Sequence, residues 1–277
     1  MKLLVTGGGG QLGAEFAETA AAAGHAVHPA ARRDLDIADP SAVNRILEEI
    51  APDALVNCAA WTKVDDAESQ PDAAFRANAL GPRVLAAACA ARGILLVHVS
   101  TDYVFDGTAT SPVDEWQRPN PRSVYGASKL AGETEVRTLA RRHQLVRTSW
   151  LYGPGKQSFL ATVAHKLKRG ETVQAISDTW ASTTYVEDLA TRVLEIVRSR
   201  AYGTHHVVND GVCSYETFAR RAAELAGIPD EIAARLIEVV SEADMKREAP
   251  RPPWTPMRSD PPLRHWEDAL AAYVSSV

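Results

Sequence analysis

The chain has 277 residues, 45% of them hydrophobic and 23% charged, a composition typical of a globular protein with one large domain or a large and a small one. Its formal net charge of −5 argues against nucleic acid or an anionic membrane surface as the main partner. No apolar run approaches the roughly 18 residues that a membrane span needs, so we expect no membrane partner either.

Short apolar runs alternate with helical stretches over the first two-thirds of the chain. The predicted strands are 2–6, 26–30, 54–60, 94–100 and 145–150, and the predicted helices are 11–23, 40–50, 72–92 and 124–143. Regular alternation of this kind requires right-handed crossovers and a parallel sheet with helices on both faces. The sequence therefore predicts an α/β fold with a doubly wound parallel sheet.

The alternation of predicted strands and helices is less regular after roughly residue 150. A helix over 187–198, a strand within 203–210, a helix over 214–226 with Ser214 as N-cap, and a closing helix within 264–274 are predicted. The segment 246–263 is too rich in proline for regular structure. We expect residues 1–150 to form the main domain, with parts of 175–200 returning to it, and 151–277 to form mainly a smaller lobe.

A glycine-rich loop follows the first predicted strand and opens the first predicted helix. Gly7, Gly10 and Gly13 have the spacing G-x-x-G-x-x-G, with Gln11 and Leu12 between the last two. Glycine permits a tight turn and close approach of a pyrophosphate, and the helix N-terminus offers free N–H groups. The motif predicts a Rossmann-type fold that binds a dinucleotide, and a merely flexible turn is the alternative.

Charged residues follow the second predicted strand, at the position where a dinucleotide-binding fold distinguishes NADPH from NADH. Arg32 and Arg33 come first and favour the 2′-phosphate of NADPH, whereas a carboxylate there would suit the ribose hydroxyl of NADH, which remains the alternative. Asp36 is placed to accept a hydrogen bond from the adenine amino group, with Ile37 beside it. A solvated charged loop would show the same pattern.

Small residues end the third predicted strand, in "VNCAAWT". Cys58, Ala59 and Ala60 would let a cofactor lie flat across the strand end, and Thr62 follows them. All four are predicted to contact the cofactor.

Tyr125 and Lys129 stand four residues apart at the start of a predicted helix, so they share one helix face. A phenol has a pKa of about 10, and we expect the nearby ammonium to lower it. The preceding strand ends in Ser100 and Thr101, which a parallel sheet brings to the same edge. Thr101 would hold a substrate carbonyl while Tyr125 supplies a proton, with Ser100 a weaker candidate for the role of Thr101.

Five motifs together carry a resemblance to a known family: the loop 7–13, "NCAAWTKVDDAE", "STDYVFDG", Tyr125-x-x-x-Lys129 and "RTSWLYG". They resemble the dTDP-4-dehydrorhamnose reductase family of extended short-chain dehydrogenases/reductases. The resemblance is strong over roughly residues 1–200 and looser in the segment "APRPPWTPMRSD", residues 249–260. The resemblance implies NAD(P)H-dependent reduction of the C4 ketone of a dTDP-4-dehydro-6-deoxyhexose, with dTDP-4-dehydro-L-rhamnose, reduced to dTDP-L-rhamnose, as the favoured substrate. No metal is needed for that chemistry.

The resemblance also implies roles for individual residues. Thr101, Tyr125 and Lys129 would form the catalytic triad. Flat aromatic faces of Tyr103 and Trp150 would meet the sugar, although buried aromatics are most often core. The implied substrate-binding set is Val64, Asp65, Thr101, Asp102, Tyr103, Trp150 and Arg251.

Two departures leave properties open. An Ala-Pro-Thr element frequent in the family is Ala-Ser-Thr at 181–183, which leaves the exact sugar open. Some members dimerise through Mg²⁺, and Glu15, Glu187 and Asp188 match that region, but surface carboxylates are usually solvated. We therefore expect no metal, and a monomer or a homodimer.

Three other functions compete with this hypothesis. A sugar dehydratase or epimerase would share the fold, but dehydratases place Glu where this chain has Tyr103. A related ketoreductase of antibiotic or streptose-type deoxysugar biosynthesis would carry nearly identical motifs. A non-catalytic binding subunit, such as the regulatory partner of methionine adenosyltransferase, would not need the intact triad.

The cysteines and the N-terminal residues indicate the cellular location of the protein. Cys58, Cys89 and Cys213 are far apart and lack metal-ligand spacing, as expected of buried thiols in a reducing compartment. The first apolar run, 3–5, is shorter than a signal peptide requires. We expect a cytoplasmic protein.

Overall fold

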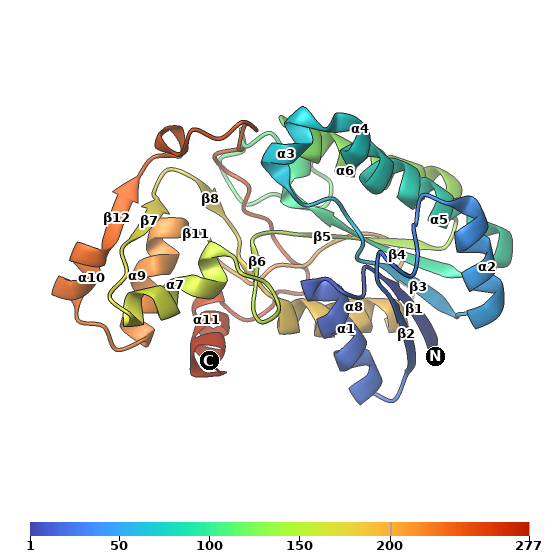
Figure 1. Ribbon diagram of the computed structural model, residues 1–277, viewed down its shortest axis with the longest axis horizontal. Helices are drawn as coiled ribbons and strands as arrows, with labels where there is room; N and C mark the ends of the chain where they lie inside the picture. The colour runs from blue at the N-terminus through green and yellow to red at the C-terminus, as the bar shows by residue number, and fades with distance from the viewer. Residues whose placement is uncertain (200, 277) are drawn as a thin grey trace.

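A computed structural model describes residues 1–199 and 201–276, and a six-stranded parallel sheet lies at its centre (Figure 1). The strand order is β2-β1-β3-β4-β5-β10. The strands are β1 (Lys2–Thr6), β2 (Ala26–Ala30), β3 (Ala54–Asn57), β4 (Leu95–Thr101), β5 (His143–Thr148) and β10 (Gly203–His206). The order reverses between β1 and β3, and ligands of such sheets bind beyond the carboxyl ends of the strands at that point. The predicted α/β fold is confirmed.

Helices cover both faces of the sheet (Figure 1). One face carries α2 (Pro40–Ile50), α5 (Gly81–Arg92) and α6 (Val124–Leu139), and the other carries α1 (Gln11–Ala22) and α8 (Val186–Ser199), which pack on each other. Successive strand residues point to opposite faces, so Leu4 joins the α2 core whereas Leu3 and Val5 join the α1 core. Both sides of β1 are therefore buried from Leu3 to Thr6.

The remaining elements lie mainly to one side of this sheet, at the left in Figure 1. They include three two-stranded sheets, β6–β9, β7–β12 and β8–β11. The elements are β6 (Leu151–Tyr152), α7 (Phe159–Lys168), β7 (Val173–Ile176), β8 (Trp180–Ala181), β9 (Thr184–Tyr185), β11 (Cys213–Ser214), α9 (Tyr215–Leu225), α10 (Asp230–Leu236), β12 (Ile237–Val240), a 3₁₀ helix (Glu242–Met245) and α11 (Trp266–Ser276). Ser214 caps α9 as predicted, its hydroxyl accepting from Thr217 N at 3.1 Å.

The helix predicted over 72–92 is broken in the structure. It consists of α4 (Pro71–Phe75), a π-helical turn (Arg76–Leu80) and α5. Pro82 lacks an N–H and its ring crowds the carbonyl four residues earlier, so the regular hydrogen-bond ladder cannot continue. The widened turn directs Asn78 toward Trp61, whose N–H donates to Asn78 Oδ1 at 2.8 Å.

Several predicted boundaries also differ from the structure. The third strand ends at Asn57, not at residue 60, because Asn57 Oδ1 accepts from Thr6 Oγ1 at 2.6 Å and from Ala59 N at 3.1 Å and so turns the chain. The helix predicted to reach residue 143 ends at Leu139, and β5 begins at His143.

The proline-rich segment 246–263, all of which the structure describes, forms only isolated bridges such as Val113↔Met257 and Trp180↔Trp254. In the described ranges, none of the helices has the length and apolar character needed to cross a bilayer.

Candidate active site

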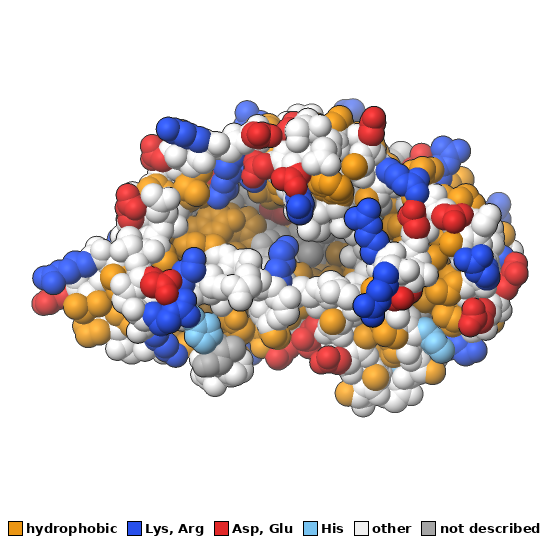
Figure 2. Space-filling view, in the orientation of Figure 1, with side chains coloured by type: hydrophobic (Ala, Val, Ile, Leu, Met, Phe, Trp, Pro, Cys, Tyr) orange, Lys and Arg blue, Asp and Glu red, His pale blue; other side chains and the backbone are white. Residues whose placement is uncertain are grey.

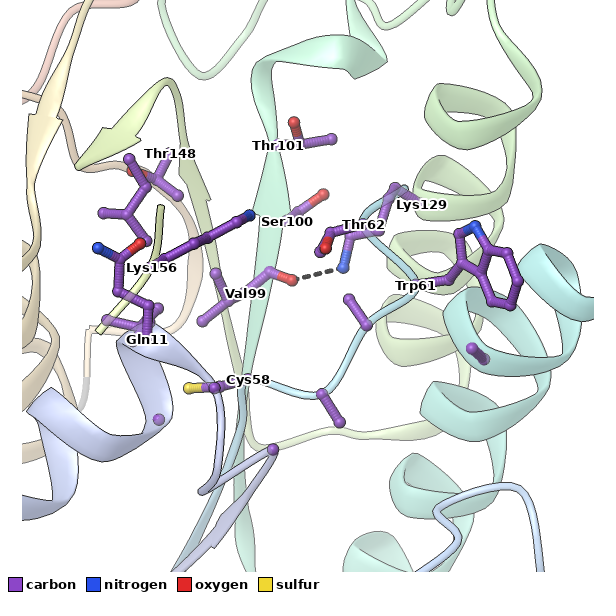
Figure 3. Close-up of a pocket in the computed structure, with 18 of the residues that line it drawn as sticks. Gln11, Cys58, Trp61, Thr62, Val99, Ser100, Thr101, Lys129, Thr148 and Lys156 are labelled. Atoms are coloured by element: carbon purple, nitrogen blue, oxygen red, sulfur yellow. Dashed lines mark hydrogen bonds between the residues drawn. The ribbon is translucent and has the colours of Figure 1, made fainter. Parts of the chain in front are cut away.

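A cavity of about 980 Å³ opens along the carboxyl ends of the central strands (Figures 2 and 3). Most of the predicted site residues line it: Gly7, Gly10, Gln11, Leu12, Gly13, Arg32, Asp36, Ile37, Cys58, Ala59, Ala60, Thr62, Val64, Thr101, Asp102, Tyr103, Tyr125, Lys129 and Trp150. Asp65 and Arg251 are not among the described residues that line the cavity. The glycine loop and the Tyr-x-x-x-Lys motif therefore share one cavity.

The glycine loop, which follows β1, lines the cavity between the end of β2 and the ends of β3 and β4. Gly7 has φ +72°, and a Cβ there would lie 2.6 Å from Ala59 N, while a Cβ on Gly13 would lie 2.2 Å from Gly7 O. Gly10 caps α1, and within the described part of the chain no side chain bonds to the first amides of this helix. Free amides at a helix start attract phosphate. The residues present therefore fit a dinucleotide diphosphate.

A cluster of charges lies farther along the cavity, beyond β2. Asp36 Oδ1 accepts from Ala38 N at 2.9 Å and Oδ2 pairs with Arg76 Nη2 at 2.5 Å. The Ala38 N–H, and then Arg76, hold the pKa of Asp36 below its usual range. No ion pair involves Arg32 within residues 1–199 and 201–276, so its guanidinium is available to a phosphate. Sequence reasoning missed Arg76, because no local pattern indicates its contact with Asp36, 40 positions away in the chain.

Helix α6 places the predicted catalytic pair. Ser123 caps it, accepting from Gly126 N at 3.1 Å, and Tyr125 and Lys129 then face the cavity. Lys129 Nζ donates to the Val99 carbonyl on β4 at 2.7 Å (Figure 3). Both side chains are buried, so any charge on them is poorly solvated.

The pKa of Tyr125 differs from the expectation. Burial raises the pKa of Tyr125 to about 12, although a hydrogen bond with Thr101 lowers it. Burial lowers the pKa of Lys129 to about 8, opposed by the Glu133 carboxylate. The expectation that Lys129 lowers the phenol pKa is wrong for this structure, because burial outweighs every opposing interaction. Tyr125 therefore keeps its proton at neutral pH, as a proton donor must.

The end of β4 supplies hydroxyl and carboxyl groups next to Tyr125. Thr101 Oγ1 donates to Asp102 Oδ1 at 3.0 Å, and the Tyr103 N–H donates to Thr101 Oγ1 at 3.3 Å. The rings of Tyr103 and Tyr125 meet edge to face with centroids 5.6 Å apart. Burial raises the pKa of Asp102, whose other oxygen accepts from Thr255. Thr101 and Tyr125 are thus neighbours, as the sequence predicts.

An aromatic pair lines the cavity beyond the end of β5. Trp150 has φ +39°, an uncommon backbone for a bulky residue and typical of functional sites. Its ring stacks on Tyr215, with centroids 3.9 Å apart and planes 25° apart. Tyr215 was not predicted, because it comes from α9, 65 positions along the chain from Trp150, and nothing local marks the contact.

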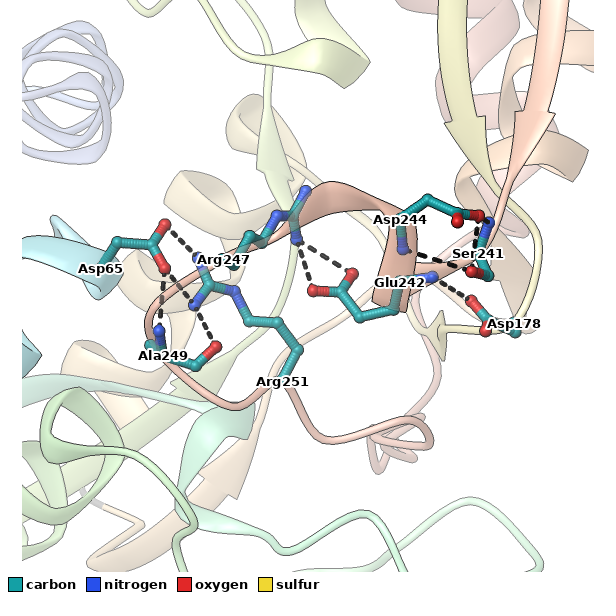
Figure 4. A network of polar contacts seen from close by, with 8 residues as sticks. All are labelled: Asp65, Asp178, Ser241, Glu242, Asp244, Arg247, Ala249 and Arg251. Carbon is teal, nitrogen blue, oxygen red and sulfur yellow. Dashed lines mark hydrogen bonds and ion pairs between the residues drawn. The ribbon is translucent and has the colours of Figure 1, made fainter.

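Asp65 and Arg251 form an ion pair with each other and do not line the cavity (Figure 4). Arg251 Nη1 lies 2.9 Å from Asp65 Oδ1 and Nη2 lies 2.8 Å from Oδ2, a two-pronged pair that joins α3 (Val64–Ser69) to the proline-rich segment. The implied roles of Asp65 and Arg251 in substrate binding stay predictions. The pair holds two segments of the chain together.

The loop 153–158 contributes Lys156, which sequence reasoning also missed. Gln11 Nε2 donates to the carbonyls of Gly153 and Pro154, both at 3.0 Å, so the loop is tied to the start of α1. Figure 3 shows Lys156 extending into the cavity toward Ser100. Other unpredicted lining residues include Ala31, Trp61, Thr148, Ser149, Ser158 and Leu160.

Two of the three acidic residues considered for Mg²⁺, Glu187 and Asp188, have protein partners. Glu187 Oε1 accepts from Tyr185 OH at 2.6 Å, and Asp188 Oδ2 accepts from Asn209 at 2.7 Å and Arg264 at 2.8 Å. Burial, and then Glu187, raises the pKa of Glu15. Across the described ranges, no group of three or more His, Cys, Asp or Glu side chains has a metal-binding arrangement.

Comparison with known proteins agrees with this geometry. A family model described as the RmlD substrate binding domain matches residues 1–277. The chain belongs to this family. The resemblance inferred from the motifs is thereby confirmed, and the RmlD family match extends over the part of the chain after residue 200 as well.

Three relatives illustrate the range of the RmlD family. The chain is 37% identical over 288 residues to a dTDP-4-dehydrorhamnose reductase of Mycobacterium tuberculosis, covering 99% of this chain and 93% of the relative. It is 36% identical over 275 residues to a dTDP-4-keto-6-deoxy-D-glucose reductase of Streptomyces niveus, covering 96% and 94%. A crystal structure of dTDP-4-dehydrorhamnose reductase from Bacillus anthracis in complex with NADP superposes with a TM-score of 0.92 at 34% identity, covering 100% of this chain and 99% of the other.

Proposed function

We propose that this chain is an oxidoreductase that uses NADPH to reduce the C4 ketone of a dTDP-4-dehydro-6-deoxyhexose. The favoured substrate is dTDP-4-dehydro-L-rhamnose, which gives dTDP-L-rhamnose, and NADH is the alternative cofactor. The observation that carries the proposal is the shared cavity, in which Thr101, Tyr125 and Lys129 lie beyond the glycine loop. The names of the relatives supply the substrate class.

The reduced nicotinamide, when bound, supplies a hydride to the ketone carbon. Tyr125 gives its proton to the ketone oxygen as negative charge develops there. Thr101, which gives its own proton to Asp102, lies beside Tyr125 and keeps the phenol next to that oxygen. Lys129, whose pKa of about 8 keeps it mostly charged at neutral pH, stabilises the phenolate that remains. Because Tyr125 starts protonated, the site is prepared for reduction.

The chain's binding groups fit the parts of these two ligands. The free amides at the start of α1 would hold the cofactor diphosphate. Arg32 and Arg76 would face the 2′-phosphate, and Cys58, Ala59 and Ala60 would form the floor under the nicotinamide half. Tyr103 and the Trp150–Tyr215 pair would give flat faces to the sugar. Each assignment uses a side chain or amide that lines the cavity.

The domain division and cellular setting follow from the same proposal. Residues 1–150, with parts of 175–200, would bind the cofactor, and 151–277 would mainly bind the sugar nucleotide. The pairing of β10 with β5 supports a returning segment and extends it to residue 206. We propose that the protein acts in the cytoplasm as a monomer or homodimer.

The test is turnover by the purified protein, followed through the absorbance of the reduced cofactor. With dTDP-4-dehydro-L-rhamnose we expect NADPH oxidation, faster than with NADH at equal concentration, because Arg32 and Arg76 favour a 2′-phosphate. A control without sugar nucleotide should show none. Equal rates with both cofactors would contradict the assignment of these arginines.

A second candidate substrate comes from the Streptomyces niveus relative, named for dTDP-4-keto-6-deoxy-D-glucose. The same assay over several dTDP-keto sugars decides between the two, because kcat/KM ranks them directly. A protein that binds NADPH yet turns over none of these sugars would instead be a binding subunit, and the reductase proposal would be wrong.

A further inference from the structure

A proline-rich strap, defined here as residues 246–265, joins the 3₁₀ helix Glu242–Met245 to α11 and crosses to the end of β4 on its way. It is held by Arg251 to α3, by the Val113↔Met257 bridge and by Ser259, whose hydroxyl donates to Val208 O at 2.9 Å. Thr255 lies between these anchors, and its N–H donates to Trp180 O at 2.9 Å. The strap is therefore fixed on both sides of Thr255.

Thr255 contacts the catalytic end of β4 directly. Its hydroxyl donates to Asp102 Oδ2 at 2.6 Å, and Asp102 Oδ1 accepts from Thr101 Oγ1 at 3.0 Å. The exposed fractions are 2% for Thr255, 1% for Asp102 and 7% for Thr101. The carboxyl group is thus a buried bridge between two hydroxyls 154 positions apart in the chain.

This bridge restricts where the Thr101 hydroxyl can point. A buried carboxylate oxygen without a donor is costly, so Asp102 keeps the orientation in which each oxygen meets one hydroxyl. Thr101 has one proton, which it gives to Asp102, and its oxygen also accepts from Tyr103 N. Loss of the Thr255 hydroxyl would free Asp102 to rotate, and Thr101 would lose its fixed position beside Tyr125.

We propose that Thr255 is a positioning residue for the reduction, which fixes the Thr101 hydroxyl beside Tyr125 through the Asp102 carboxyl group. The inference rests on the proposed function. Turnover would then depend on Thr255 of the strap, which is far in sequence from Thr101, Tyr125 and Lys129.

Thr255→Val, which keeps the size and removes the hydroxyl, is expected to lower kcat about tenfold while the KM for NADPH stays within about twofold of wild type. Thr255→Ser restores the donor and should restore kcat. Ser259→Ala is the matched control, because Ser259 is another buried strap hydroxyl that, among the described residues, bonds only to the backbone of Val208. It should leave kcat unchanged, whatever its effect on Tm.

A double-mutant cycle separates positioning from general damage. If Thr255 acts through Thr101, adding Thr255→Val to Thr101→Val should lower kcat no further. Additive losses, a kcat of Thr255→Val equal to wild type, or equal losses in Ser259→Ala would overturn the inference. Should Thr255→Val melt below the assay temperature, Thr255→Ala replaces it in the same comparisons. A wild-type protein without turnover would instead refute the proposed function.

Discussion

Tyr125→Phe is expected to lower kcat at least about a hundredfold, with little change in the KM for either substrate. The phenol is the proton donor, its hydroxyl hydrogen-bonds with Thr101, and burial keeps it protonated by raising its pKa to about 12. Phenylalanine fills the same space, so the ring contact with Tyr103 survives. Steady-state rates of NADPH oxidation measure the effect.

Tyr152→Phe is the matched control for this loss. Tyr152 is also buried, its hydroxyl has no hydrogen-bond partner among the described residues, and its ring packs against Tyr185 and Phe218. We expect a kcat close to that of wild type. Wild-type turnover by Tyr125→Phe, or a similar loss in both variants, would show that Tyr125 does not supply the proton.

Arg147→Met is expected to lower the free energy of unfolding by about 3 kcal/mol, because it leaves a buried carboxylate without its main partner. Arg147 Nε lies 2.9 Å from Glu133 Oε1 and Nη2 lies 2.8 Å from Oε2, and the two side chains are 1% and 0% exposed. This pair joins β5 to α6, the helix that carries Tyr125 and Lys129. Urea unfolding, followed by circular dichroism, measures the loss.

Arg137→Met tests whether burial causes that cost. Arg137 Nη2 contacts the same carboxylate at 2.9 Å, but its side chain is 37% exposed. Exposed ion pairs contribute little, so we expect a loss below about 1 kcal/mol. Equal losses in the two variants would mean that burial of Arg147 is not the cause.

The sequence was sufficient for elements whose signals are local. The predicted bounds of β1, β2 and α2 agree with the structure, since apolar runs define the strands and Asp39 with Pro40 marks the start of α2. Asp39 Oδ1 accepts from Ser41 N at 2.8 Å, as a cap does. Short elements such as β7 and α10 gave no periodicity long enough to recognise.

Most of the site could also be predicted, because strand ends and glycine turns are sequence signals. Contacts between distant segments could not. The contact of Arg76 with Asp36 spans 40 positions, Tyr215 depends on the docking of α9, and the pairing of Asp65 with Arg251 depends on the path of the strap. The pKa of Tyr125 also follows from burial, which no local pattern reveals.

The central claim is that Thr101, Tyr125 and Lys129 surround the reacting end of a dinucleotide held by the glycine loop. A crystal structure of the protein with NADPH tests it most directly. We expect density for the diphosphate at the amides of residues 11–13, and the nicotinamide ring within reach of the Tyr125 hydroxyl. A cofactor bound elsewhere, or with its nicotinamide pointing away from Tyr125, would contradict it.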